Sequence, residues 1–253
     1  MTIDAIGIAG TGALAAAVAV RIAAVSRARV IVHGFEVAKA GKRRFDRAAN
    51  LFDLASECAA VIAVYDSHTD LRAALTGTAD RPGLIGAMAP GSLLIDFSDG
   101  LPDECRRLAG QLAGGAIGLV ECGYVGGVEA LQCGEALIYA GGYGDHIDTV
   151  TPQLSALGRV TRIGPQGSGR MYAALSEAVR AAHFAALLEA QAVAHACGFV
   201  PDELAVPPLP AAEHARMAGH VTMARRIAQA TGTPTPVFDA LDEAAQATSI
   251  KRT

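Results

Sequence analysis

The chain has 253 residues, of which 51% are hydrophobic and 18% are charged. This length and apolar content suffice for one large domain or two smaller domains with well-buried cores. The formal net charge of −4 argues against a nucleic-acid partner, because nucleic-acid-binding domains carry a basic face.

Several features favour a cytoplasmic protein without a membrane partner. Asp4 precedes the first apolar run and glycines interrupt that run, which differs from the basic-then-apolar pattern of a secretory signal. No uninterrupted apolar stretch reaches the ~20 residues needed to span a bilayer, and no polybasic cluster favours a membrane surface. The 5 cysteines are odd in number and scattered without a CxxC pair, so we expect reduced thiols and no metal site.

A glycine turn follows the first apolar run and opens a helical segment. In the spacing Gly10-x-Gly12-x-x-Ala15, Gly10 permits a tight turn, Gly12 lets the backbone approach a pyrophosphate, and Ala15 lets the helix pack on the strand. The phosphates would then lie at the positive N-terminus of a helix. An Ala/Gly-rich loop is the alternative, but the position after a first strand favours a nucleotide site. The residues expected to contact a dinucleotide here are Gly10, Thr11, Gly12, Ala13 and Leu14.

Short apolar runs alternate with helical patterns along the first part of the chain. This alternation is typical of βαβ units, and runs that are apolar on both faces fit a parallel sheet covered by helices on both sides. We therefore predict an α/β fold with a Rossmann-type, doubly wound sheet. The expected strands are Ala5–Ala9, Val30–His33, Val61–Tyr65, Leu93–Phe97, Ile117–Glu121, Ala136–Ala140 and Arg159–Ile163.

The alternation ends at Gly164. One long Ala/Leu-rich helix without Gly or Pro is predicted over about Arg170–Cys197. We expect a dinucleotide-binding domain at residues 1–164 and a smaller all-α domain at residues 165–253, built on this interdomain helix. Its apolar faces exceed what the small domain can cover, so a homodimer formed through the helical domain is expected. The alternative is a helix packed on the chain's own first domain.

Four motif blocks and a C-terminal segment share their order and spacing with a known superfamily. The blocks are the Gly10/Gly12 turn, Ile95–Ser98, Glu121–Ala130 followed by Gly134 and Ala136–Gly142, and Gly164–Gly169; the segment is Met223–Pro236. Together they resemble the β-hydroxyacid dehydrogenase superfamily, which includes 3-hydroxyisobutyrate dehydrogenases and imine reductases. The resemblance covers nearly the whole chain and implies a nicotinamide cofactor, a small-molecule substrate and hydride transfer in a cleft between two domains.

The departures from the family pattern concern its catalytic groups. The hydroxyacid dehydrogenases carry a lysine on the long helix that moves the proton of the substrate hydroxyl, and this chain has Ala173 there. The asparagine one turn later is Glu177, the substrate-holding serine is Val125, and a lysine usual in the last domain is Gly219. Because Ala and Val cannot exchange protons, oxidation of hydroxyacids by the family mechanism is not expected.

The start of the long helix resembles the imine-reductase version, in which an apolar residue and a tyrosine precede the proton donor. Helical spacing places Tyr172, Ser176 and His183 on one stripe, with Glu177 on the neighbouring one. We expect Tyr172 to donate the proton and Glu177 to hold a cationic iminium. The alternatives are a buried phenol, a solvated carboxylate and, for His183, a packed core histidine. The catalytic candidates are Tyr172, Ser176 and Glu177, and the substrate candidates are Tyr124 in the loop after its strand, Val125, Gly126 and His183.

The end of the second strand bears on the choice between NAD and NADP. In NADPH-preferring relatives it resembles Asn-Arg-Thr with a lysine three positions on; here Phe35 replaces the arginine and only Lys39 remains. Glu36 can accept hydrogen bonds from ribose hydroxyls and would repel a 2′-phosphate, so NAD is favoured. Arg43 and Arg44 keep NADP open as the alternative.

Polar residues also follow the third and fourth strands. Tyr65 and Asp66 stand where many relatives have Leu-Pro, so we expect Tyr65 to contact the cofactor, and Ser67 or Asp66 to cap the next helix. Ser98 ends the fourth strand and is a further cofactor candidate.

The sequence thus predicts an NAD(P)H-dependent reductase of a small imine or carbonyl compound. The alternative is a catalytically divergent member that binds NAD(P) or another ligand without hydride transfer, as a scaffold or in a non-redox step.

Overall fold

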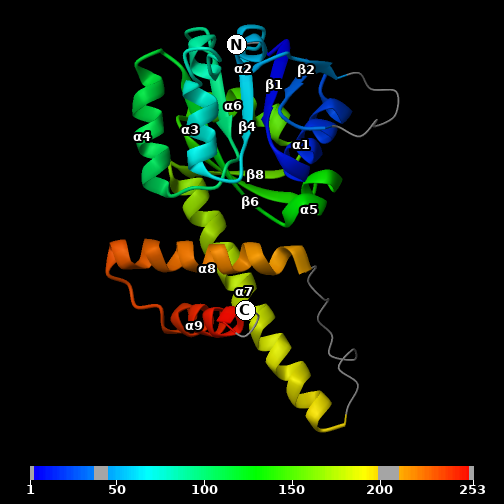
Figure 1. Cartoon of the computed structure of the whole chain (residues 1–253), viewed down its shortest axis with the longest axis vertical. Coiled ribbons are helices and arrows are strands. Elements are labelled where there is room, and N and C mark those ends of the chain that lie inside the picture. The colour runs from blue at the N-terminus through cyan, green and yellow to red at the C-terminus, as the bar shows by residue number, and fades with distance from the viewer. Residues whose placement is uncertain (1–2, 37–44, 199–210, 251–253) are drawn as a thin grey trace. The chain divides into compact units, whose positions relative to one another are not determined.

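The structure is a computed structural model that describes residues 3–36, 45–198 and 211–250 (Figure 1). The chain divides into two compact units, Met1–Tyr172 and Ala173–Thr253. The division falls inside the long helix α7 (Ser168–Ala196), so each unit contains part of that helix. None of the described helices is long and apolar enough to cross a membrane.

The first unit is built on an 8-stranded sheet in the order β3-β2-β1-β4-β5-β6-β7-β8. All neighbouring strands are parallel except the pair β6 and β7. Every strand expected from the apolar runs is confirmed, and the two-residue strand β3 was not expected. The strands are β1 Ala5–Gly10, β2 Arg29–His33, β3 Asp46–Arg47, β4 Ala60–Val64, β5 Leu93–Asp96, β6 Gly118–Val125, β7 Ala136–Gly142 and β8 Gly158–Gly164.

Helices cover both faces of this sheet, which confirms the doubly wound class. One buried cluster joins the sheet to α1, α5 and α6, and a second joins it to α2, α3, α4 and the 3-10 helix η1. In β4, Ile62 belongs to the first cluster and its neighbours Val61 and Ala63 to the second, so the strand is apolar on both faces. The helices are α1 Gly12–Val25, α2 Leu51–Ser56, α3 His68–Thr76, η1 Leu84–Gly86, α4 Pro102–Ala113, α5 Gly127–Cys133 and α6 Gly144–Leu154.

The antiparallel pair corrects two sequence-based expectations. The sheet is not wholly parallel, and Tyr124 lies inside β6, opposite Ile138 of β7, rather than in a loop after the strand. The reason is the short connection: α5 has 7 residues, whereas a crossover to a parallel strand needs a dozen or more. Gly126 and Gly127, with φ of 111° and 71°, turn the chain so that β7 starts at the edge where β6 ends.

The second unit contains the remainder of α7 with α8 (Ala211–Thr231) and α9 (Pro236–Ile250). The helix predicted over about Arg170–Cys197 is confirmed as α7. The small core of this unit consists mainly of alanines, which let helix backbones approach closely, and ion pairs of Arg225 join α8 to Asp239 and Asp242 of α9. The core residues are Ala178, Ala181, Val221 and Ala224, with Phe184, Phe238 and Leu241 packed against them.

Two glycines bring the carboxyl ends of three strands together. A Cβ atom on Gly10 would clash with the carbonyl oxygen of Val64, where β4 ends. A Cβ atom on Gly34, which follows β2 with φ of 95°, would clash with the carbonyl oxygen of Gly10. Only glycine permits this close approach, so these positions set the shape of the sheet edge beside the first helix.

Gly34→Ala is expected to lower the free energy of unfolding by more than about 3 kcal/mol. The left-handed backbone alone costs about 1–3 kcal/mol for a residue with a side chain, and the clash with Gly10 adds to it. Gly91→Ala is the matched control, because Gly91 has φ of 86° but nothing lies within 4 Å of its Cβ position. Urea denaturation of both variants measures the difference, and equal losses would contradict the close approach.

Candidate functional site

The turn between β1 and α1 exposes an uncapped helix N-terminus. The backbone N–H of Thr11 donates to the carbonyl oxygen of Val64 at 3.1 Å, which fixes the turn against β4. Thr11 is the N-cap but makes no side-chain cap hydrogen bond, and the first turn of α1 carries no acidic residue. Gly12 has φ of 71°, and nothing lies within 4 Å of its Cβ position. The N-terminus of α1 therefore has an open space beside it that a side chain at Gly12 would fill.

This turn fits the pyrophosphate of a dinucleotide. Helix N-termini attract anions through their unsatisfied N–H groups and the helix dipole. Thr11, Gly12 and Ala13 are exposed, whereas Leu14 is partly buried and packs against the core. Three of the expected turn residues thus lie at the surface, while Gly10 is buried and Leu14 anchors the helix.

Ser98 and Tyr65 join the ends of two neighbouring strands. The backbone N–H of Tyr65, just after β4, donates to the Ser98 hydroxyl oxygen at 3.1 Å, and the Ser98 N–H donates to Asp96 Oδ1 at 2.8 Å. Burial raises the pKa of the Tyr65 phenol to about 12, so it stays protonated at neutral pH. The expected helix cap by Ser67 is confirmed, since its hydroxyl accepts the N–H of Asp70 at 3.1 Å.

A buried charge network connects β5 and β6 to the start of α7. Arg170 forms a buried ion pair with Asp96 of β5. Glu121 of β6 is fully buried, and its carboxylate accepts the backbone N–H groups of Gly169 at 2.7 Å and Arg170 at 3.0 Å. Glu121 therefore satisfies two of the orphan N–H groups at the N-terminus of α7. A Cβ atom on Gly141 would clash with Glu121 Oε1, so a glycine is needed there.

Burial governs protonation in this network. Desolvation raises the pKa of Glu121, against the opposing influence of the Arg170 charge and the two backbone hydrogen bonds. Burial acts to lower the pKa of Arg170, but Asp96 and its other neighbours hold that pKa above the ordinary value. Arg170 stays charged. Desolvation also raises the pKa of the buried Cys105 and Cys122 thiols, which are therefore poor nucleophiles.

The catalytic candidates on α7 do not share one environment. Tyr172 is 46% exposed, and its ring centroid lies 5.8 Å from that of Tyr139 in β7, so the buried-phenol alternative is wrong. Ser176 is partly buried and His183 is exposed, which excludes a packed core histidine. Glu177 is only 6% exposed and pairs with Arg180 at 2.9 Å, so it is not a solvated carboxylate. The structure therefore does not bring Glu177 to the exposed side on which Tyr172 lies.

The substrate candidates in the first unit lie at the end of β6. Tyr124 and Val125 are buried, and the ring centroid of Tyr124 lies 6.1 Å from that of Phe97, which follows β5. Gly126 adopts φ of 111°, and a Cβ atom there would lie 2.7 Å from the Ala130 Cβ. Tyr124 and Val125 are thus part of the packed interior at the carboxyl end of β6.

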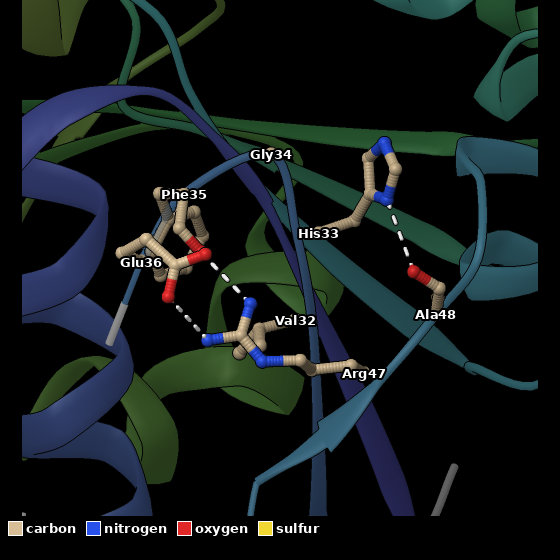
Figure 2. A pocket seen from close by; sticks show the side chains of 7 residues that line it. All are labelled: Val32, His33, Gly34, Phe35, Glu36, Arg47 and Ala48. Atoms are coloured by element: carbon tan, nitrogen blue, oxygen red, sulfur yellow. Dashed lines mark hydrogen bonds and ion pairs between the residues drawn. The ribbon is translucent and has the colours of Figure 1, made fainter. Parts of the chain in front are cut away.

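A pocket of about 410 Å³ lies at the carboxyl end of β2 (Figure 2). Its lining includes Glu36 and Arg47, which form an ion pair at 3.0 Å. Figure 2 shows the Arg47 guanidinium facing both the Glu36 carboxylate and the Phe35 carbonyl oxygen, and this carbonyl oxygen lies 3.5 Å from Arg47 Nη1. The other cofactor candidate near this strand, Lys39, lies outside the described residues, as do Arg43 and Arg44.

Sequence reasoning missed the roles of Asp96, Glu121, Arg170 and Arg47. A signal existed for the first two, because each is a single carboxylate within an apolar strand, where an unpaired charge is very costly. Arg47 gave no signal, since its strand β3 has only 2 residues. Among the described residues, no group of 3 or more His, Cys, Asp or Glu side chains is placed to hold a metal ion.

Comparison with known proteins identifies a family for most of the first unit. Residues 5–164 match the family described as the NAD-binding domain of 6-phosphogluconate dehydrogenase. An uncharacterised oxidoreductase of Shewanella frigidimarina is 29% identical over 103 residues, which are 40% of this chain and 34% of that protein. The chain spans 34–41% of the length of the curated relatives that it matches.

Solved structures share the fold of the whole chain. A 3-hydroxyisobutyrate dehydrogenase from Salmonella typhimurium has a TM-score of 0.81 at 18% identity, covering 98% of this chain and 94% of that chain. An imine reductase from Streptomyces aurantiacus has a TM-score of 0.67 at 15% identity, covering 96% and 95%. The family match covers more than half of the residues. The chain therefore belongs to the family of the 6-phosphogluconate dehydrogenase NAD-binding domain.

Proposed function

We propose that this protein is an NAD(P)H-dependent reductase of a small imine or carbonyl compound. The observation that carries the proposal is the uncapped N-terminus of α1 with the open space at Gly12. Bound there, a reduced nicotinamide dinucleotide supplies the hydride. The chain's own groups hold the pyrophosphate at Gly10–Leu14 and present Tyr65 and Ser98 at the same edge of the sheet. An odd number of scattered cysteines suits a cytoplasmic enzyme.

Reduction fits the residues on α7 better than oxidation of an alcohol does. Ala173 is buried and carries no proton-transfer group where the hydroxyacid dehydrogenases have a lysine. Oxidation needs a base for the alcohol proton, whereas an iminium is already protonated and needs mainly a placed hydride. A carbonyl or a neutral imine gains a proton as the hydride arrives, and for such substrates we assign proton donation to the exposed phenol of Tyr172, held beside Tyr139. We assign Ser176 and His183 to substrate contacts, and the buried Glu177, paired with Arg180, to support of α7.

The exposed apolar side chains of α7 support a homodimer. Leu175 and Val179 are both exposed and follow the spacing i, i+4, which places them on one face of the helix. We propose that this face packs against a second copy in an obligate interface of more than ~2,000 Å².

The first prediction tests the nucleotide turn. Gly12→Val is expected to abolish binding of NADH and NADPH, because the side chain would fill the space of the pyrophosphate. Gly91→Val controls for backbone strain, since Gly91 also has positive φ and an open Cβ position but lies before the amino end of β5. Isothermal titration measures affinity, and thermal denaturation verifies folding. Unchanged affinity of the Gly12 variant would remove the basis of the proposal.

The second prediction tests proton donation. Tyr172→Phe is expected to reduce turnover of the best substrate by about 10²-fold or more, the lower end of the range for general acid catalysis. Tyr143→Phe is the control, because Tyr143 is exposed on the loop before α6.

A panel of cyclic imines, β-keto acids and β-hydroxy acids is assayed with NADH and NADPH. Unaltered turnover of the Tyr172 variant, or robust oxidation of a β-hydroxy acid, would show that the proton chemistry lies elsewhere. Tight cofactor binding without turnover of any compound would instead favour the alternative function, in which the protein binds NAD(P) but transfers no hydride.

The third prediction concerns assembly. Light scattering of the full chain at micromolar concentration is expected to give twice the chain mass of 25.8 kDa. A monomer under those conditions would contradict the dimer and leave the apolar face of α7 without an occupant.

A further inference from the structure

Arg170 ties the start of α7 to the sheet, two residues before the proposed proton donor. Its guanidinium forms a buried ion pair with Asp96 of β5. The backbone N–H of the same residue donates to Glu121 Oε2 of β6 at 3.0 Å. Arg170 is thus held through both its side chain and its backbone, by two neighbouring strands.

Asp96 serves two segments at once. Its Oδ1 accepts the backbone N–H of Ser98 at 2.8 Å, and its Oδ2 accepts the Arg170 guanidinium. The segment after β5 and the start of α7 therefore share one carboxylate. Hydrogen bonds are stronger in such low-dielectric surroundings and favour one geometry, so the positions of Ser98 and of the helix start are linked.

The placement of Tyr172 depends on where α7 starts. Its ring centroid lies 5.8 Å from that of Tyr139, with 54° between the ring planes. A Cβ atom on Gly169 would clash with the Tyr139 carbonyl oxygen, so the helix start approaches the backbone of the same residue whose ring contacts Tyr172. Tyr172 is half-exposed, which means that packing alone restrains its phenol weakly.

Stability alone explains the Asp96–Arg170 pair poorly. The Nε and Nη1 atoms of Arg170 are buried and have no hydrogen-bond partner among the described residues. Unsatisfied buried donors cost free energy, and a buried ion pair is on balance a weak contribution to stability. What the pair supplies is a fixed separation between β5 and the start of α7.

We propose that Arg170 is a positioning residue for the proton donor: through Asp96 it holds Tyr172 beside Tyr139, in the place from which the phenol serves the substrate. This inference rests on the proposed function, since it takes Tyr172 as the donor. The Arg170 guanidinium is buried against Asp96, so it acts through Tyr172 and not on the substrate. Its loss lowers kcat and leaves cofactor affinity nearly unchanged.

A double variant, Asp96→Asn with Arg170→Met, removes the pair without leaving a buried charge unpaired. The asparagine keeps an acceptor oxygen for the Ser98 N–H. On the best carbonyl or neutral imine substrate, kcat is expected to fall at least about tenfold, because a small displacement of a catalytic group is costly. Isothermal titration is expected to give an NADH affinity within about threefold of the wild type, since α1 is untouched. Thermal denaturation verifies folding.

Gly100→Ala disturbs the same pair without removing a charge. A Cβ atom there would lie 2.7 Å from Arg170 Nη1 and 2.9 Å from Glu104 Oε2, and both atoms end flexible side chains that can move aside. The variant is therefore expected to fold and to lose at least about threefold in kcat. Gly86→Ala is the matched control, because neither glycine has positive φ and the nearest atoms to a Cβ on Gly86 are ring carbons of Phe52 at 3.8 Å.

A double-mutant cycle separates positioning from general damage. Tyr172→Phe is introduced into the wild type and into the double variant, and the kcat values of the four proteins are compared. If Arg170 acts through Tyr172, the loss of the phenol costs at least about tenfold less in the double variant than in the wild type. Independent effects multiply instead, so an equal cost in both backgrounds overturns the inference.

The ring contact gives a readout that needs neither cofactor nor substrate. The chain has 5 tyrosines, so selective labelling resolves their ring protons. The wild type is expected to show a nuclear Overhauser effect between Tyr139 and Tyr172, which is lost in the double variant, weakened in Gly100→Ala and unchanged in Gly86→Ala. A full-strength effect in the double variant overturns the inference. If the double variant does not fold, the Gly100→Ala spectrum decides by the same criterion.

The inference and the proposed function fail in different ways. If Tyr172→Phe lowers turnover but the variants at Arg170 and Gly100 keep both turnover and the ring contact, only the inference about Arg170 is wrong. If Tyr172→Phe keeps the turnover of the wild type, Tyr172 is not the donor and both fall. A protein that binds NADH but turns over no compound also overturns both.

Discussion

The docking of α7 onto the sheet depends on charges that are buried between them. The carboxylate of Glu121 accepts the backbone N–H groups of Gly169 and Arg170 in the first turn of the helix, and the Arg170 side chain reaches Asp96 on the neighbouring strand. One helix start is thereby tied to both β5 and β6. Tyr172 lies two residues further on, so its position beside Tyr139 follows from the same attachment.

This attachment determines geometry more than it adds stability. Burying two carboxylates and a guanidinium carries a desolvation penalty that their attraction barely offsets, whereas loss of one partner costs about 3–5 kcal/mol. The network therefore disfavours any arrangement in which the helix start shifts away from β5 and β6. Glycines make the approach possible: a Cβ on Gly169 would clash with the Tyr139 carbonyl oxygen, and one on Gly100 would lie 2.7 Å from Arg170 Nη1.

The pattern of apolar residues was enough to predict most of the fold, because the strands are apolar on both faces and glycines separate them from the next elements. Pattern did not predict the direction of β7, which follows from the length of α5 and the left-handed Gly126–Gly127 turn. It also did not predict β3, since two residues carry no periodicity. Placing Glu177 on a stripe next to that of Tyr172 was wrong, because five residues turn an α-helix by about 140°, and Glu177 is buried where Tyr172 is exposed.

The candidate site was predictable where one short segment supplies it and unpredictable where distant segments meet. Gly10–Leu14 form one turn, so their spacing sufficed to identify a nucleotide cradle. The partner of Glu36 comes from another strand, beyond the segment 37–44, and only the pairing of β2 with β3 brings Arg47 to it. The buried charges and the exposed pair then have opposite consequences. Desolvation makes the Asp96–Arg170 contact costly to break, so it positions its neighbours, while water screens the exposed contact between Glu36 and Arg47, which therefore adds little to stability.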